Sequence, residues 1–280
     1  MRLHTREWGT GERVAVLVHG IMADHRTWHD LVPVLTDRGY RVLAVDLRGH
    51  GASARGAYAP RLFAEDLLDT LPRRPELALG HSLGALALAL AVEELAPARA
   101  VYSEPAWRLA GSDGRLDPAL FTLFKRSPRL LTSFARPAVT ARRISDRAAN
   151  DPLPNGGPVN GGSVIGGGEG GADGGVLGVG GGVFRRVGEA DRIALEQQAL
   201  GCWDETSALA LSSHRLVDHT PDTALVPSLV QVSDPSLLVS AEMRADLVRR
   251  GFEVRTVPDA PHAIHRDRFD AFVESLSGWL

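Results

Sequence analysis

The segment Gly80-His81-Ser82-Leu83-Gly84 places a serine between two glycines, directly after a predicted strand and directly before a predicted helix. A serine at such a turn is held in a strained backbone conformation, and the small flanking residues relieve crowding against the strand and the helix. The turn exposes the hydroxyl to solvent. The pattern therefore predicts that Ser82 is a nucleophile for acyl carbons, and that the backbone N–H of Leu83 stabilises the resulting oxyanion.

A serine nucleophile requires a base, because its neutral hydroxyl reacts weakly. The chain has 10 histidines. His262 lies in the loop after the last predicted strand, so it is the expected base. His265 is close behind but resembles the start of a helix, and it is the fallback.

The base in turn requires an acid that fixes its tautomer and stabilises the imidazolium. Asp234 follows the next-to-last predicted strand and produces the chain order Ser82, Asp234, His262. Glu104 follows the strand immediately after the nucleophile and could also reach the histidine. Position along the chain favours Asp234, and Glu104 is the alternative acid.

A second oxyanion donor is expected where another strand ends, at His19-Gly20-Ile21. Gly20 allows a tight turn, after which the N–H of Ile21 can point into the cleft. His25 and His29 have the spacing of two metal ligands on one helix face, but no carboxylate or third histidine accompanies them in the sequence. Neither a metal nor a cofactor is therefore predicted.

Alternating strands and helices must position these residues. The expected sheet is largely parallel, with helices on both faces, which is a doubly wound α/β fold. Such sheets bind ligands beyond the carboxyl ends of their strands, where all the candidate residues lie. The predicted strands are residues 13–18, 41–45, 77–79, 100–103, 229–232 and 253–257, and the predicted helices are residues 27–37, 62–71, 85–95, 241–249 and 268–280.

The centre of the chain differs from its two flanks. Residues 1–105 and 220–280 are expected to form the α/β core, and residues 106–219 a helical lid inserted above the strand ends. Within the lid, residues 155–182 contain half of the chain's 30 glycines. Such a composition buries too little apolar surface to offset its ordering entropy, so a flexible loop is predicted there.

The overall composition indicates an ordinary globular protein, with 44% hydrophobic and 23% charged residues. A net charge of -3 does not indicate a nucleic-acid or anionic membrane partner. Cys202 is the only cysteine, which excludes an intrachain disulfide. Residues 1–11 do not resemble a signal peptide, and the longest apolar run, residues 83–92, is too short to span a membrane. A soluble, cytoplasmic protein with a small-molecule partner is expected.

Taken together, these motifs resemble those of the α/β-hydrolase superfamily. The resemblance covers about residues 12–105 and 225–280, but not the central segment. It rests on His19-Gly20 with Trp28, on residues 46–53, on the Ser82 pentapeptide, and on Asp234-Pro235 and Pro261-His262. It implies a structural role beside the cleft for Asp46, Arg48 and His50. A serine at the nucleophile position argues against haloalkane dehalogenase or epoxide hydrolase chemistry, for which this family uses aspartate.

The prediction is a serine-dependent hydrolase of a small ester or related acyl substrate, similar to carboxylesterases and lactonases. Two alternatives remain open. One is a non-hydrolytic acyltransferase or lyase-type synthase on the same scaffold, and the other is a degenerate ligand-binding member with little turnover. The substrate's acyl and alcohol groups and the oligomeric state do not follow from the sequence.

Overall fold

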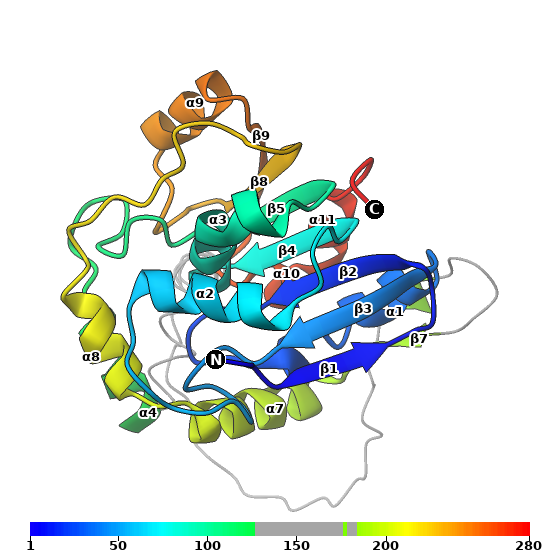
Figure 1. Ribbon diagram of the computed structural model, residues 1–280, viewed down its shortest axis with the longest axis horizontal. Coiled ribbons are helices and arrows are strands. Elements are labelled where there is room, and N and C mark those ends of the chain that lie inside the picture. The colour runs from blue at the N-terminus through cyan, green and yellow to red at the C-terminus, as the bar shows by residue number, and fades with distance from the viewer. Residues whose placement is uncertain (127–175, 178–183) are drawn as a thin grey trace, which may run out of the picture.

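A seven-stranded sheet forms the centre of the computed structural model, which describes residues 1–126, 176–177 and 184–280 (Figure 1). The strand order is β1-β3-β2-β4-β5-β8-β9. All neighbouring pairs are parallel except β1 with β3. The strands are β1 (Thr5–Trp8), β2 (Arg13–Val18), β3 (Tyr40–Val45), β4 (Leu77–His81), β5 (Arg99–Ser103), β8 (Ser228–Ser233) and β9 (Glu253–Val257).

The largely parallel sheet predicted from the sequence is confirmed. Its central strands β4 and β8 are buried along their whole length, and their Leu, Val and Ala side chains pack on both faces. The edge strand β1 is an addition to the prediction. Three of its four residues, Thr5, Arg6 and Glu7, are exposed, so it lacks the apolar pattern that identifies a buried strand.

Helices cover both faces of the sheet. On one face α2 (Pro60–Thr70) packs against α3 (Leu83–Leu95), and α9 (Ala241–Arg249) adds Met243 and Leu247 to the same apolar cluster. On the other face the 3-10 helix η1 (His25–Trp28), α1 (Leu31–Thr36), α10 (Ile264–Asp267) and α11 (Phe269–Glu274) enclose a second cluster. Figure 1 shows α2 and α3 in front of the sheet, with α1, α10 and α11 behind it. The predicted doubly wound architecture is therefore confirmed.

Two predicted helices are shorter in the structure. The helix expected over residues 27–37 is divided into η1 and α1, with Asp24 accepting the Arg26 N–H at the first end. The helix expected over residues 268–280 ends at Glu274, after which the chain forms turns and Gly278 has a positive φ of 82°.

About half of the described part of residues 106–219 is helical. It contains η2 (Pro118–Leu120), α4 (Phe121–Arg126), α7 (Glu189–Cys202) and α8 (Thr206–Ser212), and a short antiparallel pair, β6 (Val176–Leu177) with β7 (Phe184–Arg185). Leu200, Trp203 and Ala208 form a small apolar cluster against Ile21 and Met22. These helices thus pack on the loop that follows β2. Apart from residues 176–177, the predicted flexible loop at 155–182 lies outside the described residues.

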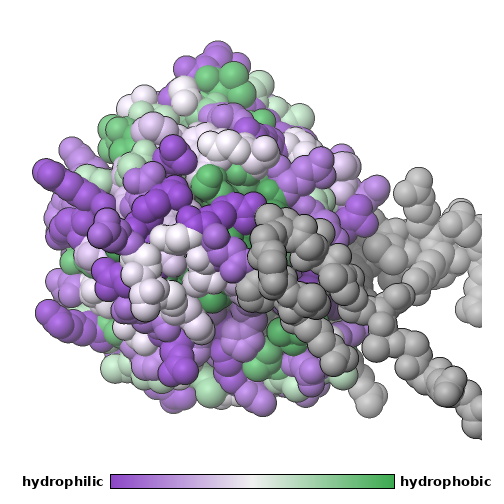
Figure 2. All heavy atoms as spheres, turned by 90° about the vertical axis from the view of Figure 1, so that its right-hand side faces the viewer, coloured by the Kyte–Doolittle hydropathy of each residue, from purple (hydrophilic) through white to green (hydrophobic). Residues whose placement is uncertain are grey.

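Polar side chains predominate on the face shown in Figure 2, and apolar side chains gather there in small separate patches. Among the described helices, none combines the length and the hydropathy needed to cross a membrane.

Candidate active site

The turn between β4 and α3 holds Ser82 in an uncommon backbone conformation, with φ of 52° and ψ of -114°. Its amide donates to Ser103 O (3.0 Å), and its carbonyl accepts from Ala106 N (3.2 Å). Glycine at position 84 is required because a Cβ there would lie 2.3 Å from the carbonyl oxygen of Val18. The backbone of neighbouring strands therefore holds the serine in a conformation that most residues avoid.

Two backbone amides are available beside this serine. Leu83 is the first residue of α3, so its N–H has no partner within the helix. Ile21 follows Gly20, where a Cβ would lie only 2.8 Å from His81 Nδ1 and 3.1 Å from Ser82 Cβ. Gly20 thus allows the loop after β2 to approach the serine closely. Among the described residues, neither amide donates a hydrogen bond, and both residues line the same cavity.

His262 and Glu104 form a pair next to Ser82. His262 Nδ1 lies 3.1 Å from Glu104 Oε2, and the Glu104 side chain is fully buried. Glu104 Oε1 also accepts from the Ser233 amide (2.7 Å), and Oε2 accepts from the Ser236 hydroxyl (3.2 Å). These donors offset the cost of burying a carboxylate. They also fix it against the histidine.

The expected pairing of His262 with Asp234 is not found. Asp234 is exposed and lines the cavity, and within the described chain it makes no hydrogen bond to His262. The position beside His262 Nδ1 is occupied by Glu104, whose side chain the Ser233 amide holds in place. The structure thus places Glu104, the alternative acid of the sequence analysis, beside His262, and does not place Asp234 there.

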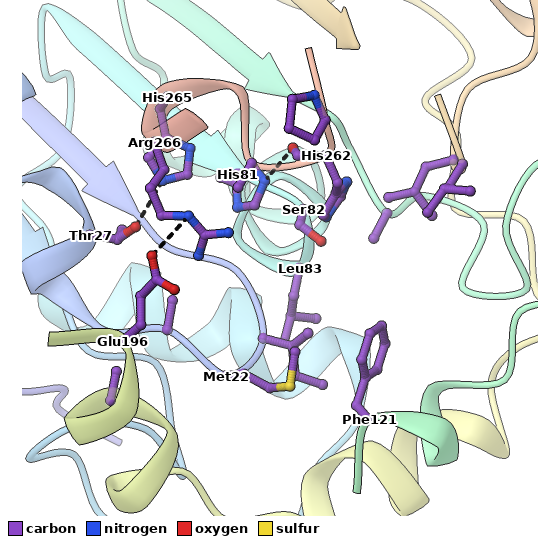
Figure 3. Close-up of a pocket in the computed structure, with 18 of the residues that line it drawn as sticks. Met22, Thr27, His81, Ser82, Leu83, Phe121, Glu196, His262, His265 and Arg266 are labelled. Atoms are coloured by element: carbon purple, nitrogen blue, oxygen red, sulfur yellow. Dashed lines mark hydrogen bonds and ion pairs between the residues drawn. The ribbon is translucent and has the colours of Figure 1, made fainter. Parts of the chain in front are cut away.

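Figure 3 shows Ser82 and His262 side by side at the cavity wall. No hydrogen bond joins the Ser82 hydroxyl to His262 within the described chain. Long contacts of this kind are common in sites without substrate and tighten when substrate binds. The His262 side chain is 32% exposed, so it has room to rotate.

His81 contacts three segments of the site: the loop at Gly20, the turn at Ser82 and the loop that bears His262. Its side chain lies against Gly20, it precedes Ser82, and its Nε2 donates to the carbonyl oxygen of His262 (3.1 Å). Burial lowers the pKa of His81 well below its ordinary value, and nearby histidines add to this effect. His81 is therefore a neutral donor that holds the loop bearing His262. The variable position of the motif gave no signal for this role.

His265, the fallback base, has a different environment. It is buried, its Nε2 pairs with Thr27 Oγ1 (2.8 Å), and its ring lies 4.5 Å from the Trp28 ring and 4.7 Å from the His81 ring. Burial lowers its pKa well below the ordinary value. His265 thus packs against His81, whereas His262 contacts the Glu104 carboxylate.

The loop after β3 supports the site from outside the cavity. Arg48 forms a bidentate ion pair with the buried Asp66 (2.6 and 2.7 Å), and His50 Nε2 accepts from the Met22 amide (3.3 Å). The Asp46 carboxylate accepts four hydrogen bonds, two of them from His25. None of Asp46, Arg48 and His50 lines the cavity, in agreement with a structural role.

Positive φ angles concentrate in the loops around the site. Among the described non-glycine residues, six have a positive φ, and four of these are Met22, Ser82, Glu104 and Asp259. Each lies in a segment that follows the carboxyl end of a parallel strand. The two others are Arg74 and Ala96.

The cavity in front of Ser82 has a volume of about 220 Å³ and two kinds of wall. Figure 3 places Leu83, Met22 and Phe121 on one side of Ser82, and Thr27, Glu196 and Arg266 on the other. Six other apolar residues of the lining belong to or pack against the same apolar cluster as Leu83: Ile21, Ala106, Leu109, Leu116, Leu211 and Leu238. On the polar side Arg266 Nε pairs with Glu196 Oε1 (3.1 Å). A molecule bound across Ser82 would contact both walls.

Comparisons with known proteins agree with this architecture. The sequence model described as "Alpha/beta hydrolase family" matches residues 15–275. A pimeloyl-[acyl-carrier protein] methyl ester esterase of Legionella pneumophila is 38% identical over 103 residues, covering 36% of this chain and 40% of that protein. The non-heme chloroperoxidase CPO-A1 of Kitasatospora aureofaciens is 37% identical over 84 residues, covering 28% of this chain and 30% of that protein. The chain thus matches less than half the length of either relative.

Solved structures show a similar fold over nearly the whole chain. The enol-lactonase from Burkholderia xenovorans LB400 superposes with a TM-score of 0.66 at 18% identity, covering 99% of this chain and 95% of that one. A likeness at this level of identity concerns the fold alone. The family model matches residues 15–275, which include the Ser82 turn and the His262 loop, and the chain belongs to the alpha/beta hydrolase family.

Proposed function

We propose that the protein is a serine hydrolase of small esters, with Ser82 as the nucleophile, His262 as the base and Glu104 as the acid. The observation that carries the proposal is the contact between His262 Nδ1 and the buried Glu104 carboxylate, next to a serine with a positive φ. The chain order is then Ser82, Glu104, His262. Sequence likeness to an esterase adds support.

The first step is attack of the Ser82 hydroxyl on the ester carbonyl carbon. His262 Nδ1 donates to Glu104, which leaves Nε2 free to accept the serine proton. Carbonyl π electrons move to oxygen, and the oxyanion binds the N–H groups of Ile21 and Leu83. The tetrahedral intermediate then collapses, the C–O bond to the leaving group breaks, and His262 returns its proton to the departing alkoxide.

Deacylation repeats these steps with water in place of serine. His262 takes a proton from a water molecule, the hydroxide adds to the acyl carbon, and the carbon–Oγ bond breaks. Ser82 recovers its proton and the carboxylic acid leaves. No cofactor is consumed in this sequence of steps.

The cavity walls favour an ester with an apolar part of limited size. Leu83, Leu109 and Phe121 line the cavity and would contact that part of the ester. Binding would then remove their apolar surface from water, which is favourable. The polar wall near Arg266 and Glu196 would face the opposite end of the substrate. Esters of short to medium chain length are therefore the proposed substrates.

The test combines covalent labelling with turnover. A fluorophosphonate should add one phosphonyl group to the wild type, detected by intact-protein mass, and none to Ser82→Ala. Ser212→Ala, on α8 and away from the cavity lining, is the matched control and should label like the wild type. Hydrolysis of p-nitrophenyl esters of increasing chain length should follow the same pattern. A folded wild type that neither labels nor hydrolyses any of these esters would contradict the proposal.

A further inference from the structure

Three potential metal ligands, His4, His25 and Asp46, lie together outside the cavity lining, where the loop after β3 begins. His4 Nδ1 lies 2.9 Å from Asp46 Oδ2, and His25 Nδ1 lies 2.7 Å from Asp46 Oδ1. The three ligand atoms all lie within 4.8 Å of one another. They come from the residue before β1, the first residue of η1 and the residue after β3, so only the folded chain brings them together.

We propose that His4, His25 and Asp46 form a binding site for a divalent transition-metal ion of the zinc type. Two imidazole nitrogens and one carboxylate oxygen are a donor set that suits Zn²⁺ and its neighbours in the first transition row. One carboxylate and two neutral imidazoles carry a charge of -1, which favours a dication. The site is open on one side, because the His4 side chain is 39% exposed and that of His25 is 17% exposed. Water can therefore complete the coordination.

The surroundings of Asp46 orient its carboxylate toward the two histidines. The amides of His25 (2.8 Å) and Ala52 (2.9 Å) each donate to one of its oxygens. Gly51 is essential to this arrangement, since a Cβ there would lie 2.3 Å from Asp46 Oδ2. Hydrogen bonds to a ligating carboxylate of this kind typically strengthen metal sites.

The backbone around His4 is held just as firmly. The His4 amide donates to Ser53 Oγ (2.8 Å), and the His4 carbonyl accepts from the Asp46 amide (2.9 Å). The position of the His4 Cα relative to the carboxylate is therefore set before any ion arrives. The His4 side chain itself is 39% exposed.

Metal binding needs a small rearrangement and no external reagent. Ligands about 2.1 Å from a tetrahedral zinc ion lie about 3.4 Å apart. The contact of Asp46 with His4 (2.9 Å) must therefore widen by about 0.5 Å, and its contact with His25 (2.7 Å) by about 0.7 Å. Small rotations of the His4 and His25 rings, which are 39% and 17% exposed, would supply this movement. Each imidazole moves its proton from Nδ1 to Nε2, and the freed Nδ1 lone pair binds the ion.

The site is structural rather than catalytic, because none of its three residues lines the cavity. Its ligand His25 nevertheless belongs to η1, whose residues Arg26 and Thr27 do line the cavity. A bound ion would therefore join the start of β1 to the segment that forms one cavity wall. The inference is independent of the proposed esterase chemistry, and failure of either leaves the other intact.

The experiment is a titration of the full-length, chelator-treated protein with ZnCl₂ near pH 7.5, followed by calorimetry and by melting temperature. One saturable site should appear, and a zinc concentration about 100-fold above Kd should raise the Tm by about 5 °C. His4→Ala, which removes a half-exposed side chain, should weaken binding at least about tenfold. At the same zinc concentration it should also reduce the shift in Tm by about half or more.

His29→Ala is the matched control. His29 lies four residues after His25, the spacing that the sequence pattern would pair with it, yet Asp46 and His4 are the partners that His25 has in the structure. Zinc binding should survive His29→Ala unchanged. Absence of a saturable site, or binding that is lost in His29→Ala and retained in His4→Ala, would overturn the inference.

Discussion

Replacing Glu104 by Gln should reduce ester hydrolysis far more than replacing Asp234 by Asn. Both changes remove a negative charge and keep the side chain's size. Glu104 is fully buried and lies 3.1 Å from His262 Nδ1, whereas Asp234 is exposed. Only the first variant removes the partner of the imidazolium that forms as Ser82 reacts.

The magnitude follows from that distance. Two unit charges 3.1 Å apart attract by about 5 kcal/mol at an effective dielectric constant near 20. Each 1.36 kcal/mol of transition-state stabilisation is a factor of ten in rate, so Glu104→Gln should lower kcat by about 10⁴-fold. An amide also favours the wrong tautomer of His262, which acts in the same direction. For Asp234→Asn, solvent screening should keep the change within about threefold.

The assay is the steady-state hydrolysis of a p-nitrophenyl ester by the wild type and both variants, measured well above KM. Circular dichroism and melting temperature establish that each variant is folded, which matters because Glu104 also accepts from the Ser233 amide. A folded Glu104→Gln variant with nearly wild-type kcat would refute the reasoning. So would a loss in Asp234→Asn comparable with that in Glu104→Gln.

Three further predictions concern the surroundings of Ser82. Gly20→Ala should lower kcat/KM by about tenfold or more, because the new Cβ would lie 2.8 Å from His81 Nδ1. The control Gly201→Ala should leave activity unchanged, because a Cβ at that position meets nothing within 4 Å. His81→Ala should lower kcat by about tenfold at similar KM. His81→Gln should recover part of the lost kcat, because its amide can donate to His262 O. An equal loss of kcat in the two variants would contradict a positioning role. Burial lowers the pKa values of His81, His265 and His50, the last to about 3, so unfolding lets each bind a proton below its ordinary 6.5. The free energy of unfolding should therefore fall from pH 7 to pH 5, by up to about 1.4 kcal/mol per pH unit for each histidine, and a constant Tm over that range would contradict this.

Much of the fold was predictable because its signals are local. Runs such as Ala15–Val18 are buried on both faces of the sheet, and they stand out as short, continuous apolar segments. The Ser82 turn was predictable because its signal lies within five consecutive residues, although the need for glycine at position 84 arises from the carbonyl of the distant Val18. The edge strand Thr5–Trp8 carries no such signal, since its pairing with β3 uses mainly backbone groups.

The choice between Glu104 and Asp234 was not predictable from spacing. Both residues follow neighbouring parallel strands, β5 and β8, so both begin at the same edge of the sheet. The two residues differ in the direction in which the chain leaves β5 and β8. Glu104 turns inward with a φ of 47° and meets the Ser233 amide, and these contacts span 129 residues. The grouping of His4 with Asp46, 42 residues apart, escaped the sequence pattern in the same way.

The concentration of positive φ angles around the cavity has a consequence for how the molecule responds to damage elsewhere. A non-glycine residue in such a conformation costs about 1–3 kcal/mol, so Met22, Ser82, Glu104 and Asp259 together draw heavily on the roughly 5–15 kcal/mol that a folded domain retains. These strained backbone conformations persist only because the surrounding core packs against the loops and holds them in place. A mutation that loosens the core far from the cavity should therefore release them before the sheet melts, and catalysis would fail at temperatures where the protein still looks folded.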